Sequence, residues 1–132
     1  MIDYSTQIFN EVSVRLRSIF SGIRVVGEYV QTPTSFPCVA MDEAQNVPVY
    51  LDTSVENKYA RVQYRVQVFS NLENGKRAEA RKIYAAVDSI MQAMGLMCKT
   101  HTTTPAIYNA EIYSITATYE GVIDKAGVVY RG

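Results

Sequence analysis

Residues Ala60 to Ser70 read ARVQYRVQVFS, and this stretch decides the fold. Apolar and polar side chains alternate along it with a strict period of two. Because successive side chains of a β-strand point to opposite faces of a sheet, the pattern predicts a strand with one buried face and one polar face. A slip of one residue would bury two arginines, so the register is firmly determined. The apolar set is Val62, Tyr64, Val66 and Val68, and the polar set is Arg61, Gln63, Arg65 and Gln67.

A segment with helical periodicity lies on each side of this strand. Before it, apolar residues recur at three- and four-residue spacing from Ile8 to Phe20. Asp3 is the expected N-cap of this helix. After the strand, a second helix is expected to begin at Asn74-Gly75 and to end at Gly95. The expected buried faces are Ile8, Phe9, Val12, Leu16, Ile19 and Phe20 in the first helix, and Ile83, Val87, Ile90 and Met94 in the second.

The remaining strands follow from β-branched residues and turn signals. Two are expected before the alternating strand and two after the second helix, with a last short strand near the end. The order α-β-β-β-α-β-β places only one helix between strands, so repeated βαβ units are absent. Residues 1–132 are therefore predicted to form a single α+β domain, with two helices and a mainly antiparallel sheet. The expected strands are Ile23–Val30, Cys38–Asp42, Leu96–Thr104, Asn109–Ile123 and Val128–Tyr130.

A long segment from Glu43 to Tyr59 has no clear period and contains Pro48. We expect a loop over residues 43–59, and a loop of this length in a compact domain is usually functional or mobile. Its apolar residues are unusual for a solvated loop, so they predict either an extra strand or a segment that docks on a neighbouring subunit. Together with two arginines of the alternating strand they form a candidate subunit interface: Val47, Val49, Tyr50, Leu51, Arg61 and Arg65.

Composition narrows the class of protein. The chain has 13 basic and 13 acidic residues, so its formal net charge is zero. This balance disfavours a general nucleic-acid binder, because phosphate neutralisation needs a basic excess. No run of apolar residues is long enough for a membrane span, and the N-terminus lacks the features of a signal peptide. Two distant cysteines, Cys38 and Cys98, are expected to be reduced thiols in a cytosolic protein.

Signs of catalytic or metal chemistry are weak. His101 is the only histidine, and with Cys98 it forms a C-x-x-H spacing. A structural zinc site normally needs four ligands, and residues three apart on a regular strand point to opposite faces. The sequence also lacks a Walker loop, a dinucleotide-binding fingerprint and a G-x-S-x-G motif. We therefore expect no catalytic residues, no metal and no cofactor, and a protein that is not an enzyme.

Four cations lie in the first half of the second expected helix. They follow Asn74-Gly75 as in a phosphate-binding helix start, but the glycine-rich cradle of such a site is missing. Cations at this end of a helix oppose its dipole. They are explained either by an acidic partner surface or by a simple solvated face. These residues are Lys76, Arg77, Arg81 and Lys82.

Several stretches resemble one group of phage proteins. They are YRVQVFSN at residues 64–71, GKR at 75–77 with the helix to Gly95, YEGVID at 119–124 and VYR at 129–131. Together they resemble the tail-terminator, tail-completion or minor-capsid proteins of the head-to-tail module of tailed bacteriophages. The resemblance runs from Ala60 to the C-terminus, about half of the chain.

This resemblance implies a structural virion protein that forms a ring, usually a hexamer. Such a ring ends the growth of the tail tube and joins the tail to the head. The implied partners are copies of the chain, tail-tube proteins and head-connector proteins, with DNA at most passing through the lumen. The protein would assemble in the host cytoplasm and remain in the virion. The alternatives are another connector or neck adaptor protein, or a small-ligand-binding α+β module.

Overall fold

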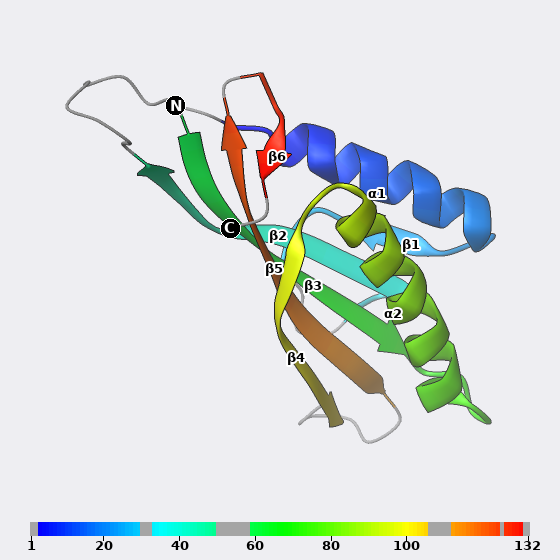
Figure 1. Ribbon diagram of the computed structural model, residues 1–132. Helices are drawn as coiled ribbons and strands as arrows, with labels where there is room; N and C mark the ends of the chain where they lie inside the picture. The colour runs from blue at the N-terminus through cyan, green and yellow to red at the C-terminus, as the bar shows by residue number, and fades with distance from the viewer. Residues whose placement is uncertain (1–2, 30–32, 50–58, 106–111, 125, 131–132) are drawn as a thin grey trace.

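The computed structural model describes residues 3–29, 33–49, 59–105, 112–124 and 126–130 (Figure 1). Two helices and six strands follow one another in the predicted order, including the short last strand that was expected near the end of the chain. The α+β class is therefore confirmed. In chain order the elements are α1 (Ser5–Ile19), β1 (Arg24–Val26), β2 (Cys38–Val49), β3 (Tyr59–Ser70), α2 (Lys76–Ala93), β4 (Met97–Pro105), β5 (Tyr113–Asp124) and β6 (Val129–Tyr130).

All strands belong to one sheet with the order β1-β2-β3-β5-β4, and β6 pairs with β5 beyond the end of β4. Every pairing is antiparallel except that of β1 with β2. The alternating strand of the sequence is β3, which lies at the centre between β2 and β5. The predicted, mainly antiparallel sheet is thus confirmed.

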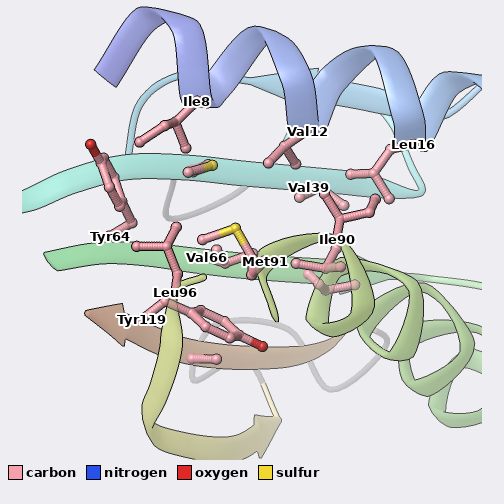
Figure 2. Close-up of a cluster of buried hydrophobic side chains, with 14 of the residues drawn as sticks. Ile8, Val12, Leu16, Val39, Tyr64, Val66, Ile90, Met91, Leu96 and Tyr119 are labelled. Carbon is pink, nitrogen blue, oxygen red and sulfur yellow. The ribbon is translucent and has the colours of Figure 1, made fainter. Parts of the chain in front are cut away.

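Both helices cover the same face of the sheet (Figure 1). In Figure 2, Ile8, Val12 and Leu16 of α1 face the strands that carry Val39 and Val66. The apolar set of β3 lies under the helices, and each of its members is at most 1% exposed. Burying a side chain of this size stabilises the fold by roughly 1.5–3 kcal/mol. α2 ends at Ala93 with Met94 as its C-cap, and Gly95 follows in the left-handed conformation (φ 88°) that was predicted to terminate the helix.

The prediction of a loop over residues 43–59 is wrong for residues 43–49. β2 does not end at Asp42 but continues to Val49, and Glu43–Val49 pairs with β3 from Tyr64 back to Tyr59. A β-bulge between Glu43 and Gln45 shifts the register by one residue, which breaks the period of two that would have marked the strand. Residues 50–58 lie outside the described part of the chain.

The first helix also departs from expectation at its end. Ile19, which was expected in the core, is 56% exposed, whereas the polar Ser13 is buried. Ile19 is the last helical residue, and the chain leaves the helix at Phe20, which packs against the core instead.

Replacing Val66 with Asp tests this core. Val66 is 1% exposed and lies under the helices, so the substitution buries a carboxylate without a partner. We expect a loss of about 3–5 kcal/mol of stability and a melting temperature lower by at least about 10 °C. Gln63→Asp, on the other face of the same strand, is the control and should cost far less. Equal melting temperatures for Val66→Asp and the unchanged chain would contradict the assignment.

Candidate subunit interface

The face of the sheet that the helices leave uncovered carries most of the predicted interface. We call it the open face, and define it by Arg61, Gln63 and Arg65 of β3 with the side chains beside them. Val47 lies directly across from Arg61, and Val49 across from Tyr59, so these side chains share this face. Four of the six candidate residues are therefore brought together: Val47, Val49, Arg61 and Arg65. Tyr50 and Leu51 lie outside the described residues.

Arg65 is held within its own subunit. Its guanidinium donates two hydrogen bonds to the Asp42 carboxylate, Nε to Oδ1 at 3.0 Å and Nη2 to Oδ2 at 2.5 Å. The ring of Tyr29 lies 4.5 Å from the guanidinium carbon, a cation–π contact. A bidentate pair of this kind fixes both side chains in one geometry. Arg65 therefore shapes the open face, while Arg61 and Val47 are exposed on it.

The side of the open face formed by β4 and β5 is polar. The Lys99 ammonium lies 3.4 Å from the Glu120 carboxylate. The Thr102 hydroxyl donates to the carbonyl oxygen of Thr116 on the neighbouring strand at 3.4 Å. Hydroxyls and one ion pair thus give this part of the face hydrogen-bonding groups without a strong charge.

One end of the open face is apolar, so the prediction of a wholly polar face is wrong there. Cys38 and Ala40 of β2, Phe69 of β3 and Ile112 form a second buried cluster, and Phe36 packs against it. The segment before β2 and the residue before β5 cover the sheet at this point. Burial raises the pKa of the Cys38 thiol, although Arg24 opposes the shift.

The pair Cys98 and His101 lies on the helix-covered face. We expected these residues to point to opposite faces, and this is wrong, because a β-bulge between Cys98 and Thr100 shifts the register. Cys98 and His101 now pair with Tyr119 and Ala117, two core residues on the same face of β5. The sequence offers no signal for this bulge. Within the described ranges, no three His, Cys, Asp or Glu residues are grouped to hold a metal ion.

Tyr84 of α2 joins this region to the core. Its ring stacks on His101 with centroids 4.7 Å apart, and its hydroxyl lies 3.7 Å from the Cys98 sulfur. The Tyr119 hydroxyl donates to Asp88 Oδ1 at 2.6 Å and lies 3.1 Å from the Tyr84 hydroxyl. Burial raises the pKa of Tyr84 to about 12 and raises that of Tyr119 above its usual range. The network keeps neutral phenols between α2 and the sheet.

These features define the class of protein as a two-layer α+β domain, with helices over one face of a sheet and a polar open face opposite. Residues 12–128 match the family model described as Tail completion protein gp17, which is most of the chain. The chain therefore belongs to this family of structural phage tail proteins and acts in tail assembly and completion. A comparison with curated proteins found no match. None of the helices in the described segments is long and apolar enough to cross a membrane.

Replacing Asp42 with Asn tests the Arg65 pair. The two side chains are 18% and 35% exposed, so solvent screens the pair in part. We expect a loss of roughly 1 kcal/mol in the free energy of unfolding, measured in urea. Glu11→Gln is the matched control, because the Glu11–Arg15 pair is 47% and 45% exposed, and its loss should cost less than about 0.5 kcal/mol. Equal losses in both variants would count against a structural role for the pair.

Alkaline pH tests the tyrosine network. An unfolded tyrosine titrates near pH 10, at about its reference pKa, whereas Tyr84 in the folded chain titrates at about 12. As pH rises, the unfolded state therefore loses its proton first, and the contribution of the neutral phenol is lost between about pH 10 and 12. We expect Tyr84→Phe to flatten this fall, which urea unfolding at a series of pH values would measure. An unchanged slope would show that Tyr84 does not contribute.

Proposed function

We propose that this protein forms a closed ring on the last ring of the tail tube, ends tail growth there and provides the surface that joins the tail to the head. The observation that carries this proposal is membership of the tail completion family over residues 12–128. The same stretches that resemble tail-terminator proteins lie in β3, α2 and β5, the elements that form the centre of the domain.

The sheet supports ring formation through its two edges. A closed ring uses a heterologous interface, in which one patch meets a different patch on the next subunit. β1 and β2 lie at one end of the strand order and β4 at the other. β1 covers β2 only at Cys38–Ala40, and no other strand of the described chain pairs with the outer edge of β2. Unpaired strand edges accept other chains readily, so the two edges are different patches on opposite sides.

The open face is suited to contacts above or below such a ring. Its exposed groups include a cation, Arg61, next to an apolar side chain, Val47. Mixed polar and apolar surfaces of this kind are typical of the rim and core of protein interfaces. The ring partners would be copies of the chain, and the ring would contact tail-tube proteins and a head-connector protein. A hexamer is what the family resemblance implies, with DNA at most passing through the lumen.

Cavity sizes do not favour the alternative of a small-ligand-binding module. Three cavities among the described residues measure about 190, 260 and 270 Å³. Sites for small organic ligands usually occupy roughly 300–1,000 Å³. At about 30 Å³ per water molecule, each cavity has room for roughly six to nine waters or for part of one large side chain.

A phage that lacks this protein tests the proposal. We expect full heads and unjoined tails, many of abnormal length, in electron micrographs of the lysate. The control is the same phage complemented by a plasmid copy, which should restore joined virions. Joined virions of normal tail length without the protein would refute the proposed function.

A further inference from the structure

A cavity of about 190 Å³ lies between the first turn of α1 and the sheet. Its wall includes Ser5 and Phe9 of α1, Gly27 after β1, Glu43 of β2 and Tyr64 of β3. In Figure 2, Tyr64 points from β3 toward the N-terminal end of α1. One water molecule occupies about 30 Å³ of liquid volume, so the cavity has room for roughly six waters. The end of one long side chain fits in the same space.

Two buried polar atoms on the wall of this cavity make no hydrogen bond of regular distance and angle within the described residues. They are the hydroxyl oxygen of Tyr64 and Oε2 of Glu43. Tyr64 is 1% exposed, and Glu43 lies directly across from it on β2. Burial raises the pKa of Tyr64 above its usual range, and the Glu43 carboxylate raises it further through its charge and a side-chain hydrogen-bonding contact, so the phenol stays neutral and faces Glu43. Leaving such groups buried and unpaired is costly, and this points to a group that enters the cavity from outside.

The polar atoms near the cavity show what that group must be. Asp42 is paired with Arg65 on the open face, and the Asp3 carboxylate accepts hydrogen bonds from the backbone N–H and hydroxyl of Ser5. The carboxylate of Glu43 therefore remains without a cation. A carboxylate with a buried oxygen is best satisfied by a positive hydrogen-bond donor, and a guanidinium is the best geometric match.

Exposed cations of this kind lie on α2. Arg77 and Arg81 are exposed, one helical turn apart, and neither makes an ion pair with a described carboxylate. α2 begins after the end of β3, at the lower right of Figure 1, whereas α1 begins near the top. The two arginines therefore cannot reach the cavity of their own subunit. The chain has no net charge, so a cation of one copy can neutralise a carboxylate of another copy without leaving an excess charge in the assembly.

We propose that the cavity beside Glu43 and Tyr64 binds the guanidinium of Arg77 or Arg81 from a second copy of this chain. The contact is heterologous, since the cavity between α1 and the sheet and the cations at the start of α2 are different patches of the molecule, and it can repeat around a ring. This inference rests on the proposed ring and names one contact that closes it. It also explains why cations occupy the first turns of α2, where they oppose the helix dipole.

Sedimentation equilibrium of the purified chain, up to near-millimolar concentration, tests this contact. Glu43→Gln, and separately Arg77→Gln with Arg81→Gln, are each expected to weaken self-association about ten- to hundredfold, the range of a charged hydrogen bond. Glu11→Gln and Arg17→Gln, exposed residues of α1 outside the cavity wall, are the matched controls and should leave association unchanged. Circular dichroism confirms that each variant is folded.

Mixing the two defective variants separates this contact from a general loss of structure. The cations of Glu43→Gln can still enter the intact cavity of the Arg77→Gln/Arg81→Gln variant. The mixture is therefore expected to form dimers but no larger species, while each variant alone stays monomeric under the same conditions. Absence of these dimers would overturn the proposal, as would a wild-type chain that remains monomeric at the highest concentration.

Tyr64→Phe provides a second readout. Removing an unpaired buried hydroxyl should raise the melting temperature of the monomer slightly, and it should weaken association because the guest loses a partner. A lower melting temperature together with unchanged association would mean that the hydroxyl is satisfied within the subunit, and would refute the site. None of these measurements uses phage. A negative result here would therefore refute the contact between copies without deciding the deletion test of tail joining.

Discussion

The pairing of β3 with β5 is the constraint on which the rest of the structure depends. The two strands, each of 12 residues, pair from Tyr59 with Asp124 to Ser70 with Tyr113. This register places Tyr64 beside Tyr119 and Val66 beside Ala117 under the helices. A slip by one residue would turn the polar set of β3 into the core, so burial on one face holds the whole sheet in place.

This division between the faces also determines where the protein can bind. The helices cover one face, so contacts with other molecules must use the open face, the strand edges, the outer surfaces of the helices or the cavity between α1 and the sheet. The positive charges on α2 and the buried Glu43 carboxylate lie in different regions of a chain with no net charge. A neutral subunit with separated charges can associate with copies of itself without the repulsion that a high net charge would cause. These properties agree with a protein of the tail completion family.

Two β-bulges explain two of the differences between expectation and structure. The bulge in β2 after Glu43 hides a strand that continues to Val49. The bulge in β4 after Cys98 turns His101 to the face that Cys98 occupies, where both contact Tyr84. A bulge adds one residue to one strand only, so it changes the facing of every residue beyond it. Periodicity within one strand cannot reveal this change, because the partner strand sets the pairing.

The sequence by itself determined the α+β class, the faces of β3, the termination of α2 before Gly95 and the family resemblance. These follow from short-range patterns, since the alternation of side chains and the left-handed preference of glycine act within a few residues. It also predicted the grouping of Val47 and Val49 with Arg61 and Arg65, although their role at an interface stays a prediction. Only the tertiary structure decided the pairing of Arg65 with Asp42, the second apolar cluster and the cavity at Tyr64. Each joins residues from separate elements, and such contacts depend on register, bulges and helix placement, which no local pattern encodes.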